Sequence, residues 1–84
     1  MEFDSAATLD LVRLGRGIRR VRLAAGYTQE ALALAAGLDR SYVGSVERGE
    51  RNISFLNLLL LARTLNTEVA SFLIELNRER PESK

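Results

Sequence analysis

Apolar residues recur at every third or fourth position along most of the chain, which is the spacing of an amphipathic helix. The first such stretch predicts a helix over residues 9–25. Its stripe consists of Leu11, Leu14, Ile18, Val21 and Ala25. Residues 1–8 have no clear period and are predicted to form a frayed N-terminal arm. Gly26 follows the stripe, where a residue of left-handed conformation would end a helix.

Two short helices joined by a tight turn are predicted next, over residues 28–36 and 39–48. Thr28 and Asp39 are suited to cap them, because a side-chain oxygen accepts from backbone N–H groups that have no partner in the first turn. Gly37 separates the two helices. The apolar positions expected to face the core are Leu32, Val43 and Val46. The opposite side of the second helix holds Arg40, Ser41, Gly44, Ser45 and Arg48. A polar and basic helix face of this kind fits the major groove of DNA.

The remaining apolar pattern predicts helices over residues 55–66 and 68–77, with a polar tail over 78–84 that is expected to be disordered past Pro81. Gly49 is expected to end the preceding helix, and Ser54 and Thr67 to cap the last two. A buried stripe is formed by Leu58, Leu61, Ala62 and Leu65. A second apolar stripe is formed by Leu56, Leu59 and Leu60. A helix that is apolar on two sides needs a second surface to cover it, from the last helix or from another subunit.

The length of 84 residues fits one domain spanning residues 1–84, and the pattern is all-α with five helices and no strand. The chain has no cysteine and no histidine, which removes disulfides, thiolate zinc sites and the commonest general base. No two acids pair at a useful spacing, so a carboxylate enzyme is not favoured. We expect no enzyme activity, no metal and no cofactor. There is neither a secretion signal nor an apolar run that could span a membrane, so a cytoplasmic location is expected.

Positive charge is concentrated in the middle of the chain. Residues 13–51 hold eight arginines against four acidic residues, although the whole chain has a net charge of only +1. The flanking segments are therefore acidic. A basic centre indicates a face that meets a polyanion such as DNA, and the alternative is ordinary solvated surface charge.

The central segment resembles the helix-turn-helix of the phage-repressor-like (Xre, Cro-type) family of DNA-binding domains. The matching positions are Gln29, Leu32, Ala33, Gly37, Leu38, Val43, Val46, Glu47 and Gly49. The upstream pattern L-G-x-x-I-R-x-x-R and the downstream N-I-S…N-L-L-L-L-A-x-x-L also fit, so that the resemblance covers roughly residues 9–76. It implies a five-helix, lambda-repressor-like DNA-binding domain.

Within that family, the segment G-L-D-R-S-Y-V-G-S-V-E-R-G-E-R-N-I-S is similar to controller proteins of restriction–modification systems. This similarity implies a homodimer that binds palindromic operators upstream of the controller and endonuclease genes, activating at low dose and repressing at high dose. RNA polymerase is a further candidate partner. The alternatives are a solitary or prophage-type repressor of the same family and an antitoxin-type module that binds another protein.

The base contacts are predicted to come from Arg40, Ser41 and Ser45, on the second helix of the central pair. A guanidinium can donate twice to guanine, and the alternative for Arg40 is a solvated side chain at a helix start. Contacts to phosphate or to the minor groove are predicted for Gln29, Tyr42, Arg48, Arg51 and Asn52. The phosphate-anchoring role of Gln29 is implied by the resemblance, and the alternative is a simple helix-start residue. The alternative for Tyr42 is a half-buried core tyrosine.

Arg22 and Glu47 are predicted to form a structural ion pair. Glu47 follows Val46 on the buried side of its helix, where an unpaired carboxylate would be costly. The family pattern places an arginine four residues before the glycine of the first turn, and Arg22 stands there. The pair would lock the first helix to the recognition helix.

A dimer interface is expected from the surplus apolar residues of the last two helices. Its members are Leu56, Leu59, Leu60, Val69, Phe72 and Leu76. With no separate effector domain, regulation is expected to follow protein concentration through the balance of monomer and dimer.

Overall fold

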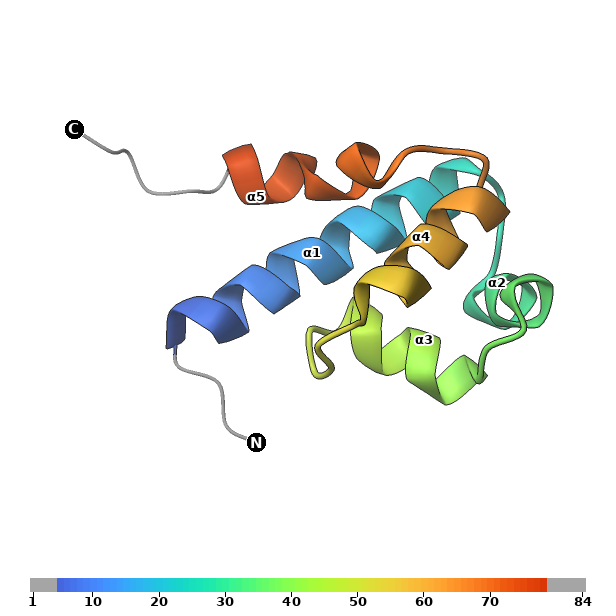
Figure 1. Cartoon of the computed structure of the whole chain (residues 1–84), viewed down its shortest axis with the longest axis horizontal. Helices are drawn as coiled ribbons and strands as arrows, with labels where there is room; N and C mark the ends of the chain where they lie inside the picture. The colour runs from blue at the N-terminus through green and yellow to red at the C-terminus, as the bar shows by residue number, and fades with distance from the viewer. Residues whose placement is uncertain (1–4, 79–84) are drawn as a thin grey trace.

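The computed structural model describes residues 5–78, and these residues form helices and short connections without any strand (Figure 1). The elements are α1 (Ser5–Ala24), α2 (Gln29–Ala36), α3 (Arg40–Glu47), α4 (Phe55–Thr64), the 3-10 helix η1 (Val69–Leu73) and α5 (Ile74–Arg78). The all-α prediction is therefore confirmed, and the helix predicted over 68–77 consists of η1 followed directly by α5, which together form the fifth helical segment.

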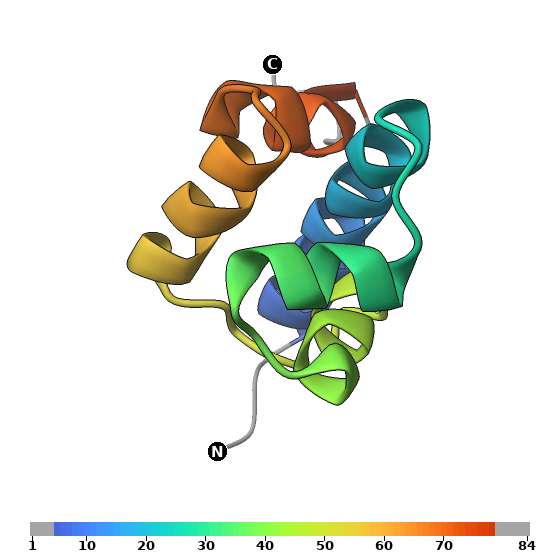
Figure 2. The same ribbon diagram turned by 90° about the vertical axis from the view of Figure 1, so that its right-hand side faces the viewer.

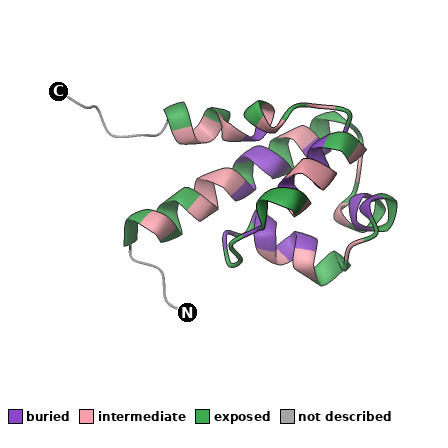
Figure 3. Ribbon diagram, viewed as in Figure 1, coloured by how far each residue is buried: buried purple, intermediate pink, exposed green. Residues whose placement is uncertain are grey.

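The long helix α1 is the spine of the domain. It contacts α3 on one flank and the continuous η1–α5 segment on another, while α4 packs against α2 and η1. Figure 2 shows α2 and α3 on one side of the domain, at the bottom of the view, and the C-terminal segment on the opposite side, at the top. The largest fully buried side chains are Ile18, Leu32, Val43, Leu61 and Phe72. Buried positions follow the middle of α1 and the facing sides of α2 and α3 (Figure 3), so one core holds the elements together.

The predicted boundaries differ from the structure at both ends. The chain is already helical from Ser5, so the predicted arm is wrong for residues 5–8, and residues 1–4 lie outside the described part. Propagation of a helix costs little once it has formed, and the alanines in this segment favour it without any apolar stripe. At the other end Arg78 belongs to α5, and the rest of the predicted tail lies outside the described residues.

The helix caps agree with the sequence at two of four positions. The hydroxyl oxygens of Thr28 and Ser54 accept from backbone N–H groups of α2 and α4 at 3.0 and 3.1 Å. Asp39 precedes α3 in an extended conformation, but its side chain makes no capping bond. Thr67 donates to the hydroxyl of Ser71 at 2.9 Å, and the residue before η1 is Glu68. Two of the predicted side-chain caps, those of Asp39 and Thr67, are therefore wrong.

Two glycines allow α1 to touch its neighbours through its backbone. A Cβ added at Gly15 would lie 2.6 Å from the carbonyl oxygen of Val46, at the end of α3. A Cβ added at Gly17 would lie 2.8 Å from the carbonyl carbon of Phe72 in η1. Both glycines are buried. Close backbone contacts on both flanks therefore explain why α1 carries two residues that weaken a helix.

No helix in the described part of the chain is long and apolar enough to cross a membrane.

Candidate nucleic-acid interface

Helices α2 and α3 form a two-helix unit around a tight turn. Gly37 adopts a left-handed conformation with φ of 70°, and the N–H of Leu38 donates to the carbonyl oxygen of Ala33 at 2.8 Å. Val43 and Val46 of α3 are 1% and 2% exposed and belong to the core. Because this side of α3 is buried against α1 and α2, the opposite side is presented outwards.

The start of α3 presents two polar side chains to solvent. Arg40 and Ser41 are exposed, and neither makes a side-chain hydrogen bond or ion pair with any residue of the described range 5–78. Ser45 is half-buried, and its hydroxyl donates to the carbonyl oxygen of Tyr42 at 2.8 Å. Arg40 and Ser41 are thus available as donors, whereas Ser45 offers its lone pairs as an acceptor.

Gly44 is buried, so its predicted exposure to solvent is wrong. An added Cβ would lie 3.2 Å from Nη1 of Arg48 and 3.4 Å from Oε1 of Gln29. These two side chains cover the glycine from the solvent side. The small residue lets Gln29 of α2 lie across α3.

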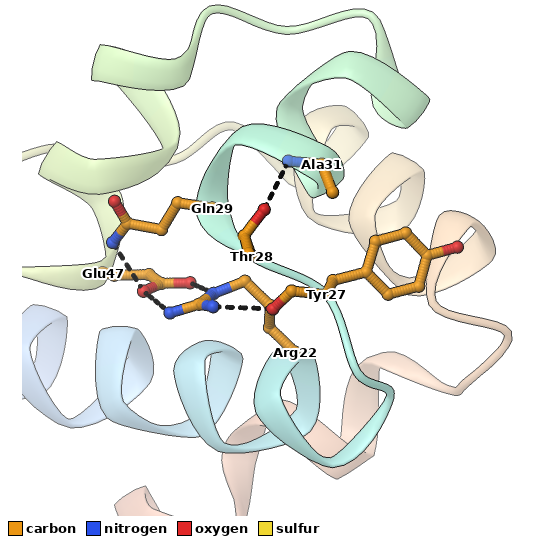
Figure 4. A network of polar contacts seen from close by, with 6 residues as sticks. All are labelled: Arg22, Tyr27, Thr28, Gln29, Ala31 and Glu47. Atoms are coloured by element: carbon orange, nitrogen blue, oxygen red, sulfur yellow. Dashed lines mark hydrogen bonds and ion pairs between the residues drawn. The ribbon is translucent and has the colours of Figure 1, made fainter.

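Arg22 and Glu47 form the predicted ion pair at the junction of α1, α2 and α3 (Figure 4). The guanidinium donates from Nε to Oε2 at 2.6 Å and from Nη2 to Oε1 at 3.0 Å. Its Nη1 donates to the carbonyl oxygen of Tyr27 at 2.8 Å. The Glu47 side chain is only 2% exposed. A two-fold charged contact of this kind is strong and directional, and it joins the first helix to the last turn of α3.

Gln29 is the third member of this network. Its Nε2 donates to Oε1 of Glu47 at 2.9 Å, which connects the first residue of α2 to the end of α3. An amide nitrogen carries two protons, so one remains for another acceptor. No buried side-chain nitrogen or oxygen in the described residues lacks a hydrogen-bond partner. The sequence pattern alone had not indicated the bond between Gln29 and Glu47.

Tyr42 connects α3 to α4. Its hydroxyl accepts from Nδ2 of Asn57 at 3.1 Å, and the guanidinium carbon of Arg51 lies 5.3 Å from the centre of its ring. The side chain is half-buried, in line with the alternative reading from the sequence. Asn57 was missed as a contributor because it is a single polar residue within a leucine-rich helix.

The loop after α3 carries exposed polar groups. Arg48 donates to both carboxylate oxygens of Glu50 at 3.1 Å, and this bond holds the pKa of Glu50 below its ordinary value. Arg51 and Asn52 are also exposed. The three predicted phosphate-contacting residues of this loop, Arg48, Arg51 and Asn52, therefore lie at the surface, but Arg48 and Arg51 already have partners within the domain.

The apolar surface of α4 only partly matches the predicted interface. Leu56 is 75% exposed, and Phe55, which the prediction omitted, is 65% exposed. Four of the predicted interface residues, Leu59, Leu60, Val69 and Leu76, are half-buried. Phe72 is fully buried in the core of the monomer, so its assignment to the interface is wrong. The helical spacing indicated that Phe72 lies on an apolar helix face, but it did not distinguish a face that packs in the core of the monomer from one that meets another subunit.

A second ion pair joins α1 to α5. Arg20 donates to both carboxylate oxygens of Glu75, from Nε at 2.6 Å and from Nη2 at 3.1 Å, and Nη2 also donates to the carbonyl oxygen of Ser71 at 2.6 Å. The hydrogen bond to Arg20 is the main cause that lowers the pKa of Glu75. The sequence did not indicate this pair, because 55 residues separate its members.

The described residues contain no cluster of three or more acidic, histidine or cysteine side chains that could hold a metal ion. The arrangement of α2, the Gly37 turn and the outward-facing α3 defines a helix-turn-helix unit. A family model described as helix-turn-helix matches residues 18–72, and the chain belongs to this family.

Among its most similar relatives are control proteins of restriction–modification systems. The control protein C.SmaI of Serratia marcescens is 45% identical over 60 residues, which cover 71% of this chain and 71% of that protein. The crystal structure of the restriction–modification controller protein C.AhdI from Aeromonas hydrophila matches with a TM-score of 0.74 and 52% identity, over 76% of this chain and 97% of that one. The controller protein C.Esp1396I, crystallised as a tetramer with its 35 base-pair operator, matches with a TM-score of 0.71 and 35% identity, over 82% and 91% of the two chains.

Proposed function

We propose that this protein is a homodimeric, sequence-specific DNA-binding transcriptional regulator, acting in the cytoplasm as the controller protein of a restriction–modification system. The observation that carries the proposal is the exposed start of α3, where Arg40 and Ser41 have no partner within the described residues. An arginine in this position can donate twice to O6 and N7 of guanine. The relatives named above, one of them crystallised with its operator, support the same assignment.

Recognition of a pseudo-palindromic site requires two copies of α3. A dimer would place them in successive major grooves about 34 Å apart on one face of the DNA. Exposed Phe55 and Leu56 at the start of α4 supply the apolar surface proposed to join the two subunits. Gln29, Tyr42, Arg48, Arg51 and Asn52 are proposed to hold the backbone, which strengthens binding without reading sequence.

The test is selection of DNA from a random pool at physiological salt, followed by affinity measurement on the selected and on an unrelated duplex. The wild type should select a symmetric consensus, and Arg40→Ala should lose the preference at one position in each half-site. Arg63→Ala, which removes an exposed arginine from α4, is the matched control and should keep the preference. Binding that depends on salt but shows no consensus would overturn the proposal.

A further inference from the structure

A groove of about 600 Å³ lies between the C-terminal half of α1, the start of α2 and the side of α3. It opens beside the network of Arg22, Gln29 and Glu47 drawn in Figure 4. Its charged lining residues are Arg19, Arg22, Arg40, Arg48, Glu30 and Glu47. Helix α1, which the predicted DNA contacts did not include, therefore contributes to the edge of the proposed DNA-binding face.

The charges of this groove are not balanced within the domain. Arg22 and Glu47 neutralise each other, and Arg48 is bonded to Glu50. The other three charged lining residues, Arg19, Arg40 and Glu30, make no side-chain hydrogen bond or ion pair in the described part of the chain. Two positive groups against one negative group leave a surplus positive charge in a concave site, which favours an anion.

Three arginines of one short run, I-R-R-V-R, point to three different surroundings. Arg20 reaches Glu75 on α5, and Arg22 reaches Glu47 on α3. Arg19 lies one helical turn before Arg22, is exposed, and lines the groove. Arg20 and Arg22 hold the fold together through these ion pairs, whereas Arg19 has no comparable role.

We propose that this groove binds a DNA backbone phosphate through the guanidinium of Arg19. The inference rests on the proposed function and adds a third helix, α1, to the DNA-binding surface. Arg19 and Arg40 are the two arginines of the groove that have no partner in the described residues, and with Arg40 directed to a base edge, Arg19 is left for the backbone. Its planar fork can donate two hydrogen bonds to the oxygens of one phosphodiester. Glu30 opposes the same anion and weakens the site.

The experiment compares the affinities of variants for the selected operator and for an unrelated duplex over a range of salt concentrations. Arg19→Ala should weaken both complexes by the same factor, because a phosphate contact carries no sequence information. Loss of one phosphate contact should reduce the fall in affinity between 50 and 200 mM salt by about three- to fourfold. Arg19→Lys should keep the salt dependence of the wild type, and Glu30→Gln should strengthen both complexes. Arg63→Ala is the control, and a melting curve of each variant establishes that it folds.

Two outcomes separate this inference from the proposed function. If the wild type selects an operator and Arg40→Ala loses the preference, but Arg19→Ala behaves like Arg63→Ala, the phosphate site is wrong and the function stands. If the wild type binds no duplex, the proposed function is wrong, and DNA is not the ligand of the groove. Titration with inorganic phosphate at low salt, followed through the arginine side-chain ¹⁵N signals, tests the groove without DNA. A saturable shift of Arg19 Nε supports the anion site, and its absence overturns it.

Discussion

Gly15 of α1 lies directly against the last turn of α3, so that an added Cβ would be 2.6 Å from the carbonyl oxygen of Val46. Backbone on both sides of the contact leaves no flexible side chain to move away. We expect Gly15→Ala to destabilise the domain by roughly 1–3 kcal/mol, because overpacking outweighs the gain of about 1 kcal/mol in helix propensity. Chemical denaturation measures the loss.

Gly17→Ala is the comparison for this variant, because Gly17 contacts η1 instead of α3. Both variants should lose stability, but only Gly15→Ala should also weaken operator binding at temperatures where the protein is folded. Unchanged or increased stability of Gly15→Ala would mean that α1 and α3 are further apart than described.

Replacement of Glu47 by glutamine should strand the buried Arg22. The expected loss is on the order of 3–5 kcal/mol, because one member of a buried pair is left without compensation. Thermal and urea unfolding at neutral pH measure it. Glu50→Gln removes the exposed partner of Arg48 and should leave the midpoint nearly unchanged. An unaltered melting temperature of Glu47→Gln would contradict the structural role of the pair.

The proposed dimer can be tested at the start of α4. Leu56 is 75% exposed, and a charge placed there should be costly to bury in an interface but harmless to the monomer. We therefore expect Leu56→Glu to sediment as a monomer at concentrations where the wild type is a dimer, and to lose cooperative operator binding. Leu34→Glu, at an 82% exposed leucine on α2, is the matched control and should remain dimeric. Dimerisation of both variants would place the interface elsewhere.

The Arg20–Glu75 pair should make the attachment of α5 dependent on pH. The hydrogen bond to Arg20 lowers the pKa of Glu75 from its ordinary value of 4.5, so folding favours the ionised carboxylate. The contribution is therefore complete well above about pH 4.5 and is lost as the pH falls through the lowered pKa. Wild type and Glu75→Gln should differ in stability at neutral pH and converge in acid. The difference should be small and should shrink in high salt, because Arg20 is partly exposed. If the difference in stability between wild type and Glu75→Gln persisted in acid, it would not come from the ionised Arg20–Glu75 pair.

The helical pattern was sufficient for the fold because each helix has a distinct apolar stripe and the turns contain residues of specific chemistry. Leu58, Leu61, Ala62 and Leu65 are all buried as their spacing indicates. Gly37 ends α2 in the left-handed conformation. The ends of the helices were harder to predict from the sequence, because an alanine-rich segment can extend a helix without any apolar periodicity.

The candidate site could be predicted where burial leaves a side chain few possible partners. A carboxylate on the buried side of a helix is such a case, because it would be costly without a positive partner. The Arg22–Glu47 pair followed from that constraint together with the family pattern. Contacts between distant surface residues, such as Arg20 with Glu75 and Asn57 with Tyr42, left no such trace. Periodicity also failed to separate the core from an interface, which is why Phe72 was misplaced.

Arg40 and Ser41 take no part in holding the described domain together, whereas Gln29 and Glu47 are tied into the junction of three helices. Under the proposed function, the side chains that stabilise the domain are therefore different from those that contact the bases. Substitutions at these two exposed residues should therefore change the preferred DNA sequence with little effect on the stability of the domain. If the base contacts lie where we propose, a library of variants at these two positions would sample new DNA sequences while leaving the core and the buried ion pair unchanged.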